Sequence, residues 1–170
     1  MKLKSAMVAD IIDDIRRVFQ ELTEQSRKVE IETGLTGPQL WVVKILNATS
    51  PMKVSDLARR TYLHPATMVG ILDRLEAKEL VKRTRSETDR RVVYIDVTEQ
   101  GRELVINSPE VVHNLLVKGL ELLDGKELTL ISYGLEHVVN LLGARGVPPK
   151  LIMSTELNIP KRRRKISETL

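Results

Sequence analysis

The hydrophobic positions near the start of the chain repeat every three or four residues. From Met7 to Thr33 they form a broad apolar stripe, which predicts one long amphipathic helix that stops at Gly34. Thr36 is the expected N-cap of the next helix, with Pro38 in its first turn. The pair Ser50-Pro51 then interrupts the pattern. Two successive helices are therefore predicted in the first fifty residues.

Two shorter helices and two β-like runs follow. Ser55 is expected to cap a short helix through Arg60, and Pro65 suits the first position of the helix after it. Residues 80–84 and 92–97 indicate strands, and the basic loop between them lacks a glycine that would force a tight turn. A helix-turn-helix followed by a charged hairpin can place one helix in the major groove of DNA and the loop against the neighbouring backbone.

The helix that begins at Pro65 has two contrasting faces. One face is apolar and is predicted to be buried: Met68, Ile71, Leu72 and Leu75. The other face is small in its middle, which permits close approach to a partner surface: Ala66, Thr67, Gly70, Asp73 and Arg74. An amphipathic helix with one face in water explains the same pattern, and the helix by itself does not decide between the two.

The second half of the chain is predicted to be helical. Thr98 is the expected cap of the helix after the second strand, and Gly101 allows that helix to pack closely against its neighbours. Residues 110–123 and 127–142 predict two further helices, separated at Asp124-Gly125. These helices are too apolar to leave one wide face in water. Together with the first helix, they are expected to form a subunit interface.

Composition excludes several classes of protein. A chain of 170 residues suits one domain with at most an appended module, and its apolar fraction of 42% is enough for a core. Aromatic residues make up only 3%, which argues against binding single strands by base stacking. There is no cysteine, which excludes disulfides, thiolate metal sites and thiol-based peroxide sensing. Because no run is long and apolar enough to span a bilayer and the start does not resemble a secretory signal, we expect a cytoplasmic protein.

Positive charge is concentrated in two places. The tail from Lys161 carries five positive charges and one negative charge, a net +4 that equals the net charge of the whole chain, so residues 1–160 are formally neutral. Affinity of the folded part for phosphates must therefore come from local clustering. The second concentration of charge lies in and around the predicted hairpin loop: Lys82, Arg83, Arg85, Arg90 and Arg91.

These features occur in an order that resembles the MarR family of bacterial transcription regulators, from about Val8 to Leu142. The resemblance is carried by Asp89-Arg90-Arg91 with Val97-Thr98-Glu99-Gln100-Gly101, which is similar to the family's wing signature and the helix start after it. Three further segments support it: Leu35-Thr36-Gly37-Pro38-Gln39-Leu40-Trp41, Val54-Ser55-Asp56-Leu57-Ala58 and Leu72-Asp73-Arg74-Leu75-Glu76. Each segment is weak alone, and the set in this order is specific.

The resemblance implies a fold and an assembly. The expected fold class is mainly α (α+β), a winged helix-turn-helix with flanking N- and C-terminal dimerisation helices. The expected division is an N-terminal dimerisation helix over 1–35, a DNA-binding domain over 36–103, C-terminal dimerisation helices over 104–153 and a basic, flexible tail over 154–170. The homodimer is expected to bind double-stranded DNA at a pseudo-palindromic operator, as a repressor by default.

The resemblance also assigns DNA-binding residues. On the recognition helix they are Pro65, Ala66, Thr67, Val69, Gly70 and Arg74. On the wing they are Arg85, Asp89, Arg90 and Arg91. Arg91 matches the arginine that reaches the minor groove, and Asp89 matches the acid that orients it, which suits the attraction of a narrow minor groove for a cation. The alternative for this pair is a surface ion pair worth about 0–1 kcal/mol.

Two positions depart from the family pattern. Glu79 stands where many members have a glycine that ends the recognition helix in a left-handed conformation, so the turn is expected to be built differently. Val69-Gly70 stands where many members have polar or basic residues. Hydrogen bonding to bases is therefore expected to be sparse, with Thr67 and apolar contacts to thymine methyl groups as the readers.

Other functions are less consistent with these residues. None of the three histidines lies in a metal or nucleophile motif, so we expect no enzyme, no metal and no cofactor, and His113 is interpreted as an ordinary helix-surface residue. A winged helix that contacts proteins instead of DNA is the alternative function. Regulators similar to this family are often released from DNA by a small molecule, and Trp41 and Tyr62 are the candidates for such an effector crevice. We favour Trp41 as a core anchor.

The basic tail has three interpretations. It is a solvated end, an arm that adds non-specific phosphate contacts, or an anchor to an acidic surface. The residues concerned are Lys161, Arg162, Arg163, Arg164 and Lys165.

Overall fold

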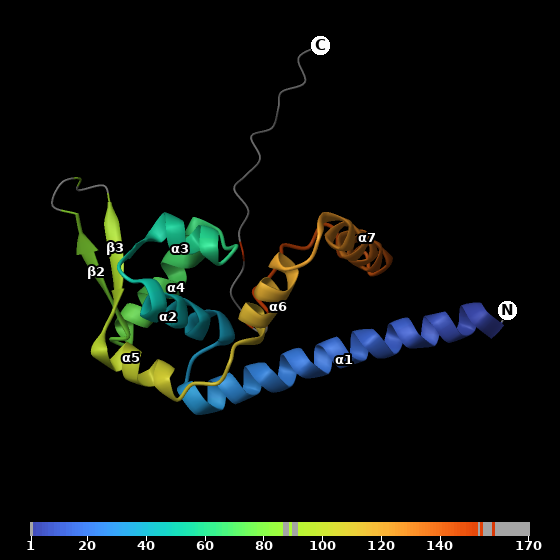
Figure 1. Cartoon of the computed structure of the whole chain (residues 1–170), viewed down its shortest axis with the longest axis horizontal. Helices are drawn as coiled ribbons and strands as arrows, with labels where there is room; N and C mark the ends of the chain where they lie inside the picture. Colours follow the sequence, from blue (N-terminus) through green and yellow to red (C-terminus); the bar gives the residue numbers. More distant parts are fainter. Residues whose placement is uncertain (1, 87–88, 90–91, 153, 155–157, 159–170) are drawn as a thin grey trace, which may run out of the picture.

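The computed structural model describes residues 2–86, 89, 92–152, 154 and 158 of the chain. Within these residues, most of the chain is helical and one small antiparallel sheet lies at the edge of the molecule, so the expected mainly α class is confirmed (Figure 1). The elements are α1 (Lys2–Thr33), α2 (Gly37–Thr49), β1 (Met52–Lys53), α3 (Val54–Arg60), α4 (Pro65–Ala77), β2 (Val81–Arg85), β3 (Val93–Val97), α5 (Glu99–Ile106), α6 (Val112–Glu121) and α7 (Gly125–Leu141).

The elements α2 to α5 form a winged-helix lobe. Its sheet has the order β1-β3-β2, with β3 antiparallel to both neighbours. The β2–β3 ladder pairs Val81 with Val97 at one end and Arg85 with Val93 at the other. Both predicted strands are confirmed to within one residue, whereas the two-residue β1 was not predicted. Two residues are too few to show an alternating pattern.

Most predicted helix starts are confirmed, and one is wrong. The N–H of Thr36 donates to the Oε1 of Gln39 (3.1 Å) at the start of α2, and the N–H of Gly101 donates to the Oγ1 of Thr98 (3.1 Å) at the start of α5. Ser55 does not cap α3, because the N-cap is Lys53, two residues earlier, and the helix begins at Val54. The sheet explains this shift, since Lys53 is paired with Tyr94 and the strand runs directly into the helix.

The core of the lobe lies between α2, α4 and the sheet. The predicted apolar face of α4 is confirmed, since Met68, Ile71, Leu72 and Leu75 are fully buried. Gly101 is also confirmed as a close-packing position, because a methyl group built there would overlap the carbonyl oxygen of Leu80.

The turn between α4 and β2 shows how the missing glycine is accommodated. Glu79 itself adopts the left-handed conformation, with φ at 58°. The N–H of Glu79 donates to the carbonyl of Glu76 (2.9 Å) and the N–H of Leu80 to that of Leu75 (3.0 Å). The expectation of a different turn is therefore wrong. The chain keeps the left-handed helix end at a conformational cost of about 1–2 kcal/mol for a residue with a Cβ atom.

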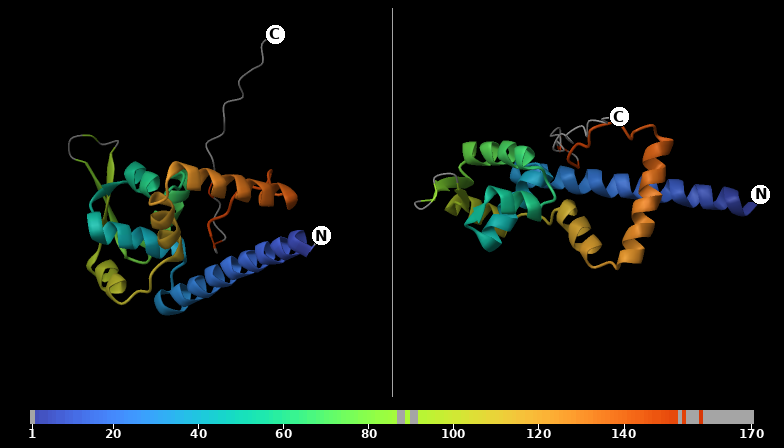
Figure 2. Two further views of the ribbon diagram at one scale, coloured as in Figure 1. Left: turned by 45° about the vertical axis from the view of Figure 1, so that its right-hand side comes forward. Right: turned by 90° about the horizontal axis from the view of Figure 1, so that it is seen from above.

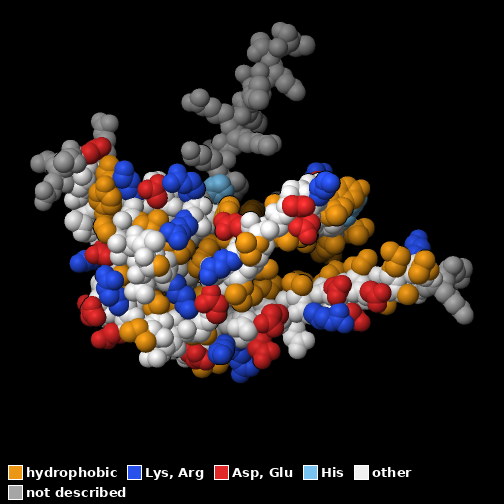
Figure 3. All heavy atoms as spheres, viewed as in Figure 1, with side chains coloured by type: hydrophobic (Ala, Val, Ile, Leu, Met, Phe, Trp, Pro, Cys, Tyr) orange, Lys and Arg blue, Asp and Glu red, His pale blue; other side chains and the backbone are white. Residues whose placement is uncertain are grey.

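The three helices outside the lobe leave apolar faces in solvent. α1 begins at Lys2, earlier than expected, and ends at Gly34 as predicted. Figure 2 shows α1 extending away from the lobe, with α6 and α7 on the same side of the lobe as the free end of α1. Hydrophobic side chains follow the edge of α1 that faces these helices (Figure 3). Val8 and Phe19 on α1, and Leu130 and Leu135 on α7, are each more than half exposed, and no residue of α6 or α7 is buried.

Among the described residues, no helix combines the length and the hydrophobicity needed to cross a membrane.

Candidate nucleic-acid interface

The outer face of α4 is the first part of the candidate interface. Pro65, Ala66, Val69 and Arg74 are exposed there, and Gly70 is half-exposed, as the sequence predicted. Thr67 is a correction, because only 7% of it is exposed. The reason is helix periodicity: Thr67 precedes buried Ile71 by four residues and so lies on the same side of the helix. Thr67 is therefore packed against the lobe.

The wing is the second part of the candidate interface. Arg85 is exposed at the end of β2, and Asp89 is exposed in the loop. The N–H of Asp89 donates to the Oγ of Ser86 (3.3 Å), and the N–H of Val92 donates to the carbonyl of Asp89 (2.9 Å). These bonds fold the start and end of the loop into a turn. Arg90 and Arg91 lie outside the described residues, so the pairing of Arg91 with Asp89 remains a prediction.

Part of the predicted basic cluster is used inside the lobe. The guanidinium of Arg83 contacts Asp73 (2.6 Å) and Glu76 (2.9 Å), both on α4, and is only 29% exposed. Lys82 pairs with Asp96 at 3.7 Å. Arg83 therefore fastens the wing to the recognition helix and is not available for phosphates. Among the described residues of this cluster, Arg85 is the one that lies at the end of β2, next to the loop.

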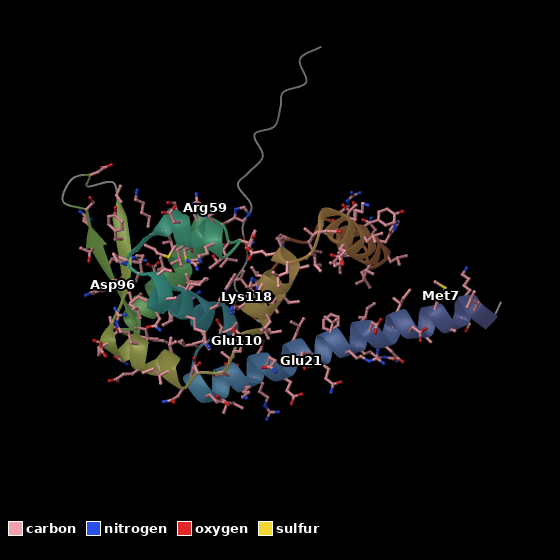
Figure 4. All side chains as sticks on the ribbon, viewed as in Figure 1. Met7, Glu21, Arg59, Asp96, Glu110 and Lys118 are labelled. Atoms are coloured by element: carbon pink, nitrogen blue, oxygen red, sulfur yellow. The ribbon has the colours of Figure 1, made fainter. Side chains whose placement is uncertain are left out.

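Asp96 holds the other side of the wing (Figure 4). Its carboxylate accepts a hydrogen bond from the hydroxyl of Ser50 (2.6 Å) and lies 3.7 Å from the guanidinium of Arg102. The hydrogen bond from Ser50 lowers the pKa of Asp96, with smaller contributions from Lys82 and Arg102, while partial burial opposes the shift. β3 is thereby tied to the end of α2 and to α5. Nothing in the sequence pattern marked Asp96 for this role.

The chain after α7 returns to the start of the recognition helix. Leu151 is buried in the lobe, with 4% of it exposed. The Oδ1 of Asn158 accepts a hydrogen bond from the N–H of His64 (2.9 Å), the residue just before α4. The N–H of Asn158 donates to the carbonyl of Pro149 (2.9 Å). The candidate phosphate-binding residues Lys161, Arg162, Arg163, Arg164 and Lys165 lie outside the described residues.

A crevice of about 450 Å³ opens beside Tyr62, between the turn that precedes α4, one side of α6 and the start of α7. Its lining is mostly apolar: Tyr62, His113, Leu116, Val117, Leu120, Glu121, Leu128 and Ile152. The hydroxyl of Tyr62 donates to a carboxylate oxygen of Glu121 (2.7 Å), and this contact raises the pKa of Tyr62. Trp41 does not line the crevice and is a core anchor, as favoured from the sequence, since 3% of it is exposed.

His113 links the crevice to the core, and its interpretation as an ordinary surface residue is wrong. Its ring lies against that of Trp41, with the centroids 4.4 Å apart. The Nδ1 atom is buried and has no hydrogen-bond partner among the described residues. Burial lowers the pKa of His113 below its ordinary value of 6.5. The described residues contain no group of three or more side chains suited to hold a metal ion.

The burial of His113 predicts a loss of stability in acid. Because the folded state disfavours the charged imidazole, the unfolded state takes up the proton first, and the free energy of unfolding falls as the pH drops below about 6.5. One proton limits the slope to about 1.4 kcal/mol per pH unit. Urea unfolding between pH 7.5 and 5 measures it. His113→Leu should flatten the dependence of the free energy of unfolding on pH. The control is His137→Leu, on the exposed side of α7, which should keep the wild-type dependence. Equal slopes for the wild type and both variants would contradict the prediction.

Comparison with known proteins agrees with this geometry. Residues 35–93 match the model of the MarR family. The chain is 38% identical over 105 residues to the uncharacterised HTH-type transcriptional regulator YfiV of Bacillus subtilis, a match covering 62% of this chain and 66% of that protein. It is 32% identical over 101 residues to the HTH-type transcriptional repressor MdtR of the same organism, covering 59% and 65%. The match thus spans just under two thirds of each relative's length.

Solved structures show the same fold. A MepR-like protein complexed with pseudoligands has a TM-score of 0.55 and 25% identity, covering 79% of this chain and 95% of that one. The Staphylococcus aureus MepR–DNA complex has a TM-score of 0.53 and 19% identity, covering 75% and 94%. With the winged-helix lobe, the match of residues 35–93 shows that the central region of the chain is similar to the MarR family.

Proposed function

We propose that this protein is a sequence-specific DNA-binding transcription regulator. The observation that carries the proposal is the placement of an exposed helix, α4, beside a basic hairpin that Arg83 fastens to it. A helix in the major groove and a cationic wing against the neighbouring backbone is how winged helices bind duplex DNA. The MepR structure that shares this fold was solved with DNA.

We propose that the functional unit is a homodimer. The exposed apolar residues of α1, α6 and α7 are too extensive for a soluble monomer, and a second copy of the chain would cover them. Two symmetric recognition helices then enter successive major grooves on one side of the duplex. The operator is pseudo-palindromic, with half-site centres roughly 10 bp apart. Binding over a promoter blocks polymerase, so repression is the expected outcome. The protein should then reduce in vitro transcription from a promoter that carries the operator.

The wing supplies the first test. Arg91→Ala should weaken binding to an operator selected from genomic fragments by about 5- to 100-fold, the range expected when one good groove interaction is removed, while the protein stays a folded dimer. Fluorescence anisotropy measures the affinity and sedimentation measures the dimer. Arg17→Ala is the matched control, since Arg17 lies on α1 in an exposed pair with Asp14. An Arg91→Ala protein with wild-type affinity would remove the wing from the interface.

Repeating the DNA titration at low and high salt distinguishes DNA binding from the alternative function, a winged helix that contacts proteins. DNA binding should weaken steeply with salt through counterion release, whereas an apolar contact with another protein should not. Absence of binding to any duplex at moderate ionic strength would favour the protein-contact module.

We further propose that the basic run from Lys161 to Lys165 adds non-specific phosphate contacts. The support is the hydrogen bond between Asn158 and His64, which holds Asn158 at the start of the recognition helix. Three further residues of chain reach at most about 11 Å. The run therefore begins close to the proposed DNA surface, on a folded part that is formally neutral and needs added positive charge.

Deleting residues 161–170 should lower the affinity for all duplexes in the same proportion. The plot of log affinity against log salt should become shallower by about 0.9 for each phosphate that the run neutralises in the full chain. Deletion of 166–170 alone, which spares the basic run, is the control. Identical salt slopes for the full chain and the longer deletion would show that the run does not contact DNA.

We propose that the crevice beside Tyr62 binds a small effector that releases the protein from DNA. The lining is apolar, and Glu121 is the charged side chain in it, so an uncharged or cationic aromatic compound fits better than an anion. Tyr62 belongs to the turn between α3 and α4, and Glu121 to α6. A ligand here contacts both the DNA-reading part and a helix of the proposed dimer interface.

Trp41 provides the readout for the crevice, because it is the only tryptophan in the chain and its ring lies against that of His113. 1-Naphthylmethylamine should change Trp41 emission and weaken operator binding more than 1-naphthoate does. Glu121→Gln should remove that preference, and Glu136→Gln on α7 should keep it. Unchanged emission and operator affinity with both compounds would contradict the proposal.

A further inference from the structure

The outer face of α4 offers few hydrogen-bonding side chains over its first two turns. Pro65 and Ala66 are exposed and apolar, and Val69 is 45% exposed. Thr67, whose hydroxyl was expected to read bases, is buried, with 7% of it exposed. Gly70 has no side chain, and no neighbouring atom lies within 4 Å of the position that a Cβ atom would take there. A base edge brought against this part of the helix therefore meets carbon atoms and the backbone.

The charged side chains of the face lie further along the helix. Asp73 is held by Arg83 at 2.6 Å, and the second arm of that guanidinium holds Glu76. Arg74 belongs to the last turn of α4. At about 1.5 Å per residue, it lies about 7.5 Å along the axis from Val69, which is more than two base-pair steps away. These groups therefore leave the region around Val69 without a polar reader.

An apolar hollow of about 400 Å³ opens beside Val69. Three elements supply its walls: the start of α3, the first turns of α4, and the beginning of the returning wing strand. The lining residues are Lys53, Val54, Ser55, Pro65, Val69, Val92 and Val93. Since its walls are the recognition helix and the wing, the hollow is continuous with the proposed DNA interface. Lys53, the cation of the lining, is exposed and suits a neighbouring phosphate.

Among the four bases, only thymine presents an apolar group in the major groove, its 5-methyl. The small residues Ala66 and Gly70 let the helix approach the groove closely. We propose that this protein reads thymine through its 5-methyl group, which packs against Val69 and into the hollow between α4 and the wing. Val69 is then a specificity-determining residue. This inference rests on the proposed DNA binding.

Uracil substitution tests the proposal, because deoxyuridine lacks only the 5-methyl group and keeps every hydrogen-bonding atom of thymine. In the selected operator, each thymine is replaced in turn and the affinity is measured by anisotropy. One or two positions in each half-site should lose about three- to tenfold in affinity, the size expected for exposing one methyl group. The remaining thymines should show no change.

Variants of Val69 assign the effect to this residue. Val69→Ala should bind the thymine operator more weakly and lose most of the uracil effect at the same positions. Val69→Thr keeps the shape but replaces one methyl group with a hydroxyl, and its uracil effect should also shrink. Val147→Ala, an exposed valine after α7, is the control and should keep the full effect. Because Val69 is partly exposed, these variants should fold, which circular dichroism checks.

The outcomes distinguish this inference from the proposed function. Salt-dependent operator binding without any sensitive thymine would overturn the methyl reading and leave DNA binding intact. A full uracil effect in Val69→Ala would place the reader elsewhere. Failure of the wild-type protein to bind any duplex would reject the proposed function itself.

Discussion

The burial of one face of α4 is the constraint on which the candidate interface depends. Met68, Ile71, Leu72 and Leu75 are fully buried, so the helix cannot rotate without exposing a large apolar area. This fixed rotation decides which side chains point outward. It removes Thr67 from the surface and leaves Val69 on it. Arg83 then sets the distance between this face and the wing, since its guanidinium contacts two carboxylates of the same helix.

The sequence was sufficient for the elements but not for every side chain. Periodicity and caps located α1, α2, α4 and both wing strands, because those signals act within a few residues. Two of the errors concern long-range contacts. Ser55 failed as a cap because β1 pairs with β3, and His113 was misplaced because Trp41 comes from a distant helix. The position of Thr67 could have been predicted, since it lies one helical turn before Ile71.

The same reasoning explains why charge was misjudged. The sequence shows a cluster of basic residues around the hairpin, from which affinity for phosphates was expected to come. In the fold, Lys82 and Arg83 have carboxylates within reach, because β2 lies next to both β3 and α4. Charges near the sheet are therefore neutralised locally, whereas the five consecutive cations of the tail have few acidic neighbours in sequence. A count of basic residues could not show which cations are paired with carboxylates, because that pairing depends on which strands and helices lie side by side.

The hydrogen bond between Tyr62 and Glu121 joins the two halves of the chain. Tyr62 adopts a left-handed conformation, with φ at 54°, in the turn that leads into α4. Its hydroxyl reaches across the crevice to the last residue of α6, at a contact open to solvent. An exposed hydrogen bond of this kind exchanges readily with water or with a ligand. The turn that leads into α4 is thus joined to α6 by an exposed contact, which is where the proposed effector would act.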